Sequence, residues 1–144
     1  MRLSIPLIAA LALSAVPAQA CRVMRPPLDR IGGAYQSKII ASVAHVRVVE
    51  SRDLGQPRGD AKPWEATARV ERVVRGSNPV RKVRFSQGWG SAACDLGYGR
   101  PQPGDRWAAY FWNHPEKGQQ VWLALPLQVS DEIEGELRKR HRAR

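Results

Sequence analysis

The sequence predicts a mainly β fold: a small barrel of five antiparallel strands, followed by a short C-terminal helix. Three observations lead to this expectation. Segments in which apolar and polar residues alternate recur along the chain, as half-buried strands require. Turns rich in glycine and proline separate these segments. Only the final segment, with acids at its start and bases at its end, has the charge pattern of a helix.

Five segments carry the strand pattern, and the clearest is the one that begins at Trp64. Its alternation predicts that Trp64 faces inward, and the same holds for Trp107 in the fourth segment. The predicted strands are residues 39–49, 64–71, 82–85, 106–112 and 120–127. A sandwich of the immunoglobulin type is the competing architecture, but it needs about seven strands.

Both ends of the predicted barrel carry further signals. Residues 21–33 contain a Pro-Pro and a Gly-Gly pair, which predicts an extended arm laid over the barrel. Residues 131–144 form the predicted helix with its basic tail, and Ser130 is the expected N-cap. We expect the basic tip of this helix to fray. The barrel domain is then residues 21–130.

The first 20 residues have the outline of a secretory signal peptide. A positive start precedes an apolar run at residues 3–16, and Ala18 and Ala20 form an Ala-x-Ala cleavage pattern. The apolar run is short of the roughly 20 residues that cross a bilayer. Cleavage after Ala20 makes Cys21 the first residue. A lipidated Cys21 is the alternative, although such sites usually carry Leu, Val or Ile where Ala18 stands.

Export places the chain in the periplasm or outside the cell, where cysteines oxidise. Cys21 and Cys94 are the two cysteines of the sequence, so the simplest expectation is a disulfide between them. On the chain-entropy model, closing this loop removes denatured-state entropy worth roughly 4 to 4.5 kcal/mol. The alternative is that Cys94 is a buried thiol and Cys21 carries a lipid.

The order of several segments resembles the netrin-like domains, the group that includes the tissue inhibitors of metalloproteinases. The likeness lies in a cysteine at the mature start, in a glycine-rich segment bearing Cys94, and in the stretches IIASV (39–43), VERVVRG (70–76) and GDRWAAY (104–110). It extends over residues 21–127. The resemblance implies a five-stranded barrel of the oligonucleotide/oligosaccharide-binding kind.

The resemblance also implies a role for the mature N-terminus. In the inhibitors, the first cysteine places its α-amino nitrogen and carbonyl oxygen on the zinc of a protease, and the matching residue here is Cys21. Catalytic zinc keeps an open position, and a rigid terminus loses little entropy on docking. The chain departs from the inhibitors at Arg22, where they have a small hydroxyl residue, and at Val23, where they have a cysteine. We therefore favour a structural role for Cys21 over inhibition.

The sequence does not predict an enzyme, a cofactor or a metal site. The histidines His45, His114 and His141 are far apart and show no zinc-type spacing to one another or to a cysteine. Ser91 lacks the flanking glycines of a nucleophile elbow. A phosphate-binding loop is absent from the sequence.

Binding is the favoured function, because the formal net charge is +10 and basic surfaces attract anionic partners. The expected partner is a protein or an anionic polymer of the cell envelope, and an anionic membrane surface is a further candidate. An anionic glycan or single-stranded nucleic acid on an OB-like barrel is the alternative, although export argues against nucleic acid. The candidate binding residues are Cys21, Arg22, Arg81, Arg84, Trp89 and Trp112.

Overall fold

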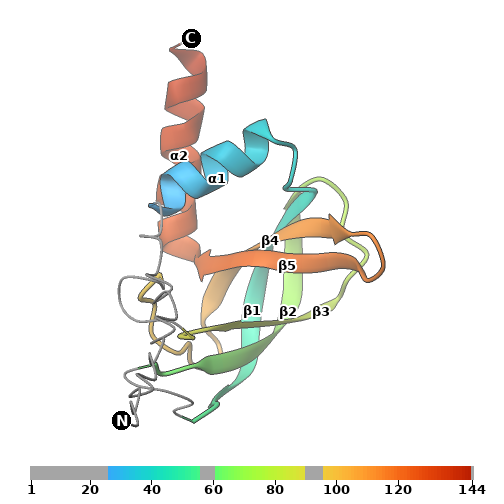
Figure 1. Ribbon diagram of the computed structural model, residues 1–144, viewed down its shortest axis with the longest axis vertical. Coiled ribbons are helices and arrows are strands. Elements are labelled where there is room, and N and C mark those ends of the chain that lie inside the picture. The colour runs from blue at the N-terminus through green and yellow to red at the C-terminus, as the bar shows by residue number, and fades with distance from the viewer. Residues whose placement is uncertain (1–25, 56–60, 90–95, 144) are drawn as a thin grey trace, which may run out of the picture.

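The computed structural model describes residues 26–55, 61–89 and 96–143. Two helices flank five strands in the chain order α1, β1, β2, β3, β4, β5, α2 (Figure 1). The elements are α1 (Pro27–Gln36), β1 (Ser42–Asp53), β2 (Trp64–Arg75), β3 (Lys82–Gln87), β4 (Arg106–His114), β5 (Gly118–Pro126) and α2 (Leu127–Arg142). The predicted mainly β fold with a C-terminal helix is confirmed.

The five strands form one antiparallel sheet in the order β3-β2-β1-β4-β5. The sheet curls, so its edge strands β3 and β5 come near each other (Figure 1). The side-chain amide of Gln87 at the end of β3 donates a hydrogen bond of 2.7 Å to the carbonyl oxygen of Ala124 in β5. No backbone ladder joins these two edges among the described residues. The sheet is therefore an open, curled one, and full closure into a barrel is not observed.

The inner face of the curled sheet holds the main hydrophobic core. Trp64 and Trp107 are 3% and 4% exposed and pack edge to face, with ring centroids 5.6 Å apart. Phe85 of β3 completes this aromatic cluster at 6.0 and 5.5 Å from the two tryptophans. The inward orientation predicted for both tryptophans is confirmed. The indole nitrogen of Trp64 donates to the carbonyl oxygen of Tyr98, which satisfies it in this apolar setting.

Irregularities between β1 and β2 help to curl the sheet. The pairing shifts between His45–Arg72 and Val46–Val70, so Glu71 is one extra residue on β2. A β-bulge of this kind bends its strand and increases the local twist. It also turns the side chains after it, so that both Glu71 and Arg72 are exposed.

A second core lies between the helices and the outer face of β1, β4 and β5. Ile31 of α1, Tyr110 of β4 and Leu125 of β5 are fully buried in it, and Leu137 of α2 packs against them. Ser130 of α2 is also buried, and its hydroxyl lies 2.8 Å from that of Tyr110. The helices therefore cover only one part of the outer face. They leave uncovered the part that carries Arg106, Arg47, Arg69 and Lys82, all of which are exposed.

The predicted extended arm is wrong from Pro27 onward, because Pro27–Gln36 is a helix, whereas residues 21–25 lie outside the described residues. Proline suits the first turn of a helix, where no backbone amide hydrogen is needed. Ile31 and Ala34 are buried on its inner side, and tertiary burial offsets the poor helix propensity of Gly32 and Gly33.

Element boundaries also differ from the predicted ones. β1 begins three residues later than predicted and ends four residues later, at Asp53, and β2 runs on to Arg75. Helix α2 begins at Leu127 and continues to Arg142, so Ser130 is not its N-cap and the basic tip is helical. The basic residues of its last turn face the negative end of the helix dipole, which stabilises that end. Within the described ranges, neither helix is long and apolar enough to cross a membrane.

Candidate functional site

Four cations form a row across the uncovered outer face of the sheet. The strand register places Arg47 of β1 opposite Arg106 of β4 on one side and opposite Arg69 of β2 on the other. Arg69 in turn pairs with Lys82 of β3. All four are exposed and each is next to an inward-facing core residue, so they share the outer face. We call Arg106, Arg47, Arg69 and Lys82 the cation row.

Neighbouring strands are about 4.8 Å apart, so the cation row places four positive charges at close and regular intervals. Like charges directly opposite each other on a sheet are destabilising. The only carboxylate that forms a salt bridge with the row, among the described residues, is that of Glu71. One half of the row is thereby compensated and the other half is not.

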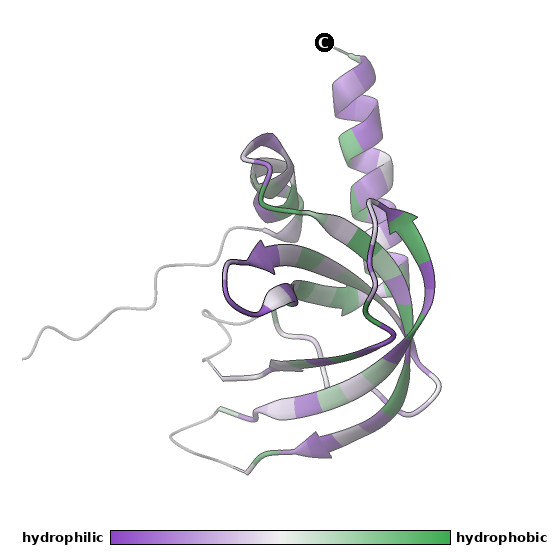
Figure 2. Ribbon diagram, turned by 90° about the vertical axis from the view of Figure 1, so that its right-hand side faces the viewer, coloured by the Kyte–Doolittle hydropathy of each residue, from purple (hydrophilic) through white to green (hydrophobic). Residues whose placement is uncertain are grey.

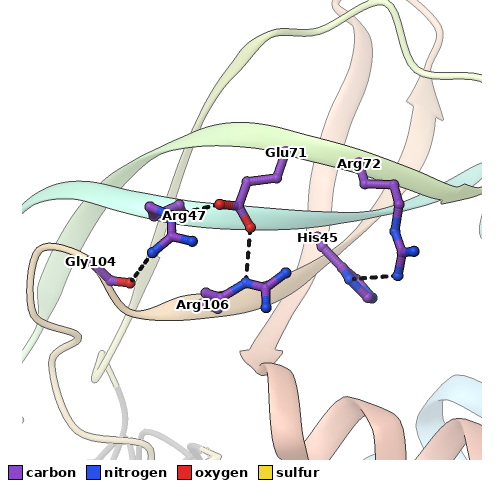
Figure 3. A network of polar contacts seen from close by, with 6 residues as sticks. All are labelled: His45, Arg47, Glu71, Arg72, Gly104 and Arg106. Atoms are coloured by element: carbon purple, nitrogen blue, oxygen red, sulfur yellow. Dashed lines mark hydrogen bonds and ion pairs between the residues drawn. The ribbon is translucent and has the colours of Figure 1, made fainter.

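The compensated half is the contact of Glu71 with Arg47 and Arg106 (Figure 3). The two carboxylate oxygens of Glu71 accept hydrogen bonds of 2.6 Å from Arg47 Nε and 2.9 Å from Arg106 Nε. Arg47 also donates to the carbonyl oxygen of Gly104. The hydrogen bonds from Arg47 and Arg106 lower the pKa of Glu71, so its carboxylate stays ionised. These pairs are exposed, and exposed salt bridges contribute little to stability.

The uncompensated half is formed by Arg69 and Lys82. Neither side chain takes part in a salt bridge within the part of the chain that the structure describes. Arg84, two residues further along β3, is on the same face, and its Nε is 3.8 Å from the carboxylate of Glu65. Arg52 holds that carboxylate more closely, at 3.0 Å. This side of the face therefore presents an excess of positive charge to solvent.

A histidine and an arginine extend the basic face toward α2 (Figure 3). Arg72 NH2 lies 3.4 Å from His45 Nδ1. Burial lowers the pKa of His45, and the positive charge of Arg72 lowers it further. A neutral imidazole accepts a hydrogen bond from the guanidinium, so Arg72 supplies the charge here and His45 orients it.

The structure brings together only some of the residues predicted for the site. Arg84 lies beside the cation row, and the exposed Arg81 precedes β3. Trp89 is 57% exposed, and its indole nitrogen donates to Ser86 Oγ. Trp112 is half-buried, and its ring is 5.2 Å from that of His114.

The two candidate tryptophans come from different parts of the sheet. Trp89 follows Gln87, whose partner Trp64 pairs with Asp53 at the end of β1. Trp112 follows Phe111, which pairs with Ser42 at the start of β1. Among the described residues, the ring contacts do not include a pair between Trp89 and Trp112.

Cys21, Arg22 and Cys94 lie outside the described residues, so the disulfide and the role of the N-terminus stay predictions. Among the described residues, no three or more His, Cys, Asp or Glu side chains are grouped so as to hold a metal ion.

The predicted site residues include no member of the cation row, which consists of Arg106, Arg47, Arg69 and Lys82. Alternation in the sequence already places Arg47 and Arg69 on the solvent side of their strands. The signal that was missing is the register, which alone shows that these residues are neighbours.

A search of protein families, curated proteins and solved structures found no match to this chain.

Proposed function

We propose that this chain is an exported, non-enzymatic binding protein that holds an anionic glycan of the cell envelope against the outer face of β4, β1, β2 and β3, along the cation row. The cation row is the observation that carries this proposal. Its four side chains come from four neighbouring strands, so together they follow a line across the sheet. A linear polymer with repeated negative charges is the ligand that fits such a line.

Binding of a polyanion relieves an unfavourable feature of the unbound protein. The facing cations Arg47, Arg69 and Lys82 repel one another. A negative group between any two of them turns that repulsion into attraction. The interaction is electrostatic and exposed, so added salt screens it.

The composition of the face favours a glycan over single-stranded nucleic acid. Proteins that bind single strands combine basic grooves with aromatic side chains on which bases stack. No aromatic residue faces outward between Arg47, Arg69 and Lys82, and Trp64 and Trp107 are committed to the core. Charge, rather than stacking, is what this face offers to a ligand.

The test compares two double variants that remove the same number of charges. Arg69→Ala with Lys82→Ala removes the uncompensated half of the row, and Lys139→Ala with Arg142→Ala removes two cations from the exposed end of α2. Binding to alginate and to heparin is measured by calorimetry over a range of salt concentrations, with dextran as the uncharged control. We expect the row variant to lose at least about tenfold in affinity and its logarithmic salt slope to fall by about 2.

Two outcomes would overturn the proposal. If both double variants lose affinity equally, binding follows net charge and the row has no special role. If oligothymidylate binds more tightly than either polysaccharide, the single-stranded nucleic acid alternative is correct. Arg84→Ala should weaken glycan binding less than the row variant, because Arg84 already has a carboxylate nearby.

The netrin-like kinship and the disulfide belong to the same proposal. The antiparallel five-stranded sheet with a C-terminal helix is compatible with that kinship. Intact-mass measurement of the secreted protein, with and without reduction before alkylation, tests whether Cys21 begins the chain and is bridged to Cys94. Two alkylated cysteines without reduction, or a lipid mass on Cys21, would remove the kinship. If Cys21 also inhibits a zinc protease, adding one residue before Cys21 should abolish that inhibition.

A further inference from the structure

A groove of about 930 Å³ lies between α1 and α2, on a different part of the molecule from the cation row. Helix α1 crosses α2, and α2 continues past it, away from the sheet (Figure 1). Leu28, Gly32 and Gly33 of α1 and Leu137 of α2 supply apolar lining. The volume is within the range of known ligand sites.

The two glycines of α1 differ in what they do for packing. A Cβ at Gly32 would lie 3.2 Å from Leu137 Cδ2, so this glycine lets α1 pack closely on α2. A Cβ at Gly33 would meet nothing within 4 Å. Glycine in a helix interior costs roughly 0.5 to 1 kcal/mol relative to alanine. Packing explains Gly32 but not Gly33, whose bare backbone widens the groove.

The rim of the groove is strongly basic. Arg75 of β2 and Arg138, Arg140, His141 and Arg142 of α2 line it. Two carboxylates also line the groove, but both have partners. Asp29 is 3.7 Å from Arg140, and Glu134 accepts a hydrogen bond from Tyr35.

The cations of the rim are less completely paired than its acids. Arg138 and Arg142 form no salt bridge in the residues that the structure describes. Arg75 stacks over the ring of Tyr35, with its guanidinium carbon 4.1 Å from the ring centroid. The groove therefore combines apolar lining with several positive charges, so charge complementarity favours a negatively charged occupant.

This chemistry separates the candidate occupants. A second copy of the chain carries the same net charge of +10 and would be repelled. A bilayer needs protruding apolar side chains, but the apolar residues here are recessed and the projecting end of α2 is mainly hydrophilic (Figure 2). A fatty acid supplies only one negative charge. An amphipathic helix with an acidic polar face supplies both an apolar ridge and several charges.

We propose that the groove between α1 and α2 binds an acidic amphipathic helix of a protein partner. The apolar ridge of that helix packs on Leu28, Leu137 and the exposed backbone of Gly33, and its carboxylates face Arg138 and Arg142. This site is separate from the glycan face, so each can fail without the other.

The test uses a fluorescein-labelled peptide of leucine and glutamate with leucines at positions i, i+3, i+4 and i+7. The control peptide has the same composition in scrambled order. Gly33→Leu fills the groove without changing any charge. The Arg69→Ala, Lys82→Ala double variant lowers the net charge away from the groove, so it controls for general electrostatic attraction of the acidic peptide. We expect the amphipathic peptide to bind the unmodified protein and the row variant alike, and Gly33→Leu to lose at least tenfold in affinity.

Thermal unfolding shows whether Gly33→Leu folds, and we expect no loss of stability because leucine favours a helix over glycine. Equal binding of the scrambled peptide, unchanged binding by Gly33→Leu, or no binding of the amphipathic peptide would each overturn the proposal. Displacement of the peptide by a fatty acid, or by vesicles rich in phosphatidylglycerol, would assign the groove to a lipid instead.

Discussion

Three glycine-to-alanine substitutions test the backbone arrangement from which both proposed sites follow. Gly76 directly follows β2 and has a φ of +68°, and a Cβ there would lie 2.3 Å from the carbonyl oxygen of Ala41. Gly118 has almost the same φ, +66°, but a Cβ there would meet nothing within 4 Å. Gly33 is helical and equally open. The three positions therefore isolate clash, backbone strain and helix propensity.

The expected magnitudes follow from these differences. An alanine in the left-handed region costs roughly 1 to 2 kcal/mol, which is the whole effect at Gly118. At Gly76 the backbone of Ala41 also has to move, which adds about 1 to 3 kcal/mol. At Gly33 alanine should stabilise by roughly 0.5 to 1 kcal/mol. In a domain of this size, Gly76→Ala should lower Tm by on the order of 10 °C, and Gly118→Ala by about half as much.

Thermal unfolding followed by circular dichroism, at one pH and one protein concentration, measures all three variants. The order of Tm should be Gly33→Ala, unmodified protein, Gly118→Ala, Gly76→Ala. A Gly76→Ala variant as stable as Gly118→Ala would refute the close contact between the β2–β3 turn and the start of β1. A Gly33→Ala variant that loses stability would refute the open helical position assigned to Gly33.

The further predictions concern Glu71, the contact between Tyr110 and Ser130, and His45. Glu71→Gln removes the negative charge that pairs with Arg47 and Arg106. The affinity for alginate should therefore rise several-fold, with a steeper salt dependence. Unchanged or weaker binding in calorimetry would contradict this prediction. Tyr110→Phe should cost about 1 to 3 kcal/mol in urea unfolding because it leaves the buried Ser130 hydroxyl without its partner. Ser130→Ala should cost less, because the hydroxyl of Tyr110 still reaches Glu134 at 3.3 Å. The pKa of His45 is lowered in the folded state, so the unfolded chain takes up the proton first on acidification. The protein should therefore lose more stability than His45→Gln as the pH falls below about 6.5, and parallel Tm curves would contradict that.

The strands could be predicted because their signal is local. Alternation around Trp64 and Trp107 reflects the two-residue repeat of side-chain direction in any strand, and both side chains face the core. Helix α1 could not be predicted in the same way. Its Pro-Pro and Gly-Gly pairs are local signals for extended or turn structure, and they are outweighed by burial of Ile31 against strands far along the chain.

In the candidate site, too, local features could be predicted from the sequence and contacts between distant segments could not. The exposed positions of Arg84 and Arg69 follow from alternation, and Arg84 was a predicted binding residue. The contact of Glu71 with Arg47 and Arg106 depends on a bulge in β2, which no local pattern indicates. Trp89 and Trp112 were grouped as binding candidates because of their residue type, but their described contacts are local: Trp89 bonds to Ser86 and Trp112 packs on His114.

The sequence by itself determined the strand content, the inward tryptophans and the basic character of the chain. Those properties depend on residue type and on the direction of each side chain relative to its neighbours in the chain. Tertiary structure alone decided that Arg106, Arg47, Arg69 and Lys82 stand in one row and that α1 and α2 enclose a groove. The physical reason is that register and helix packing are set by hydrogen bonds and buried contacts between distant segments, which only the folded chain brings together.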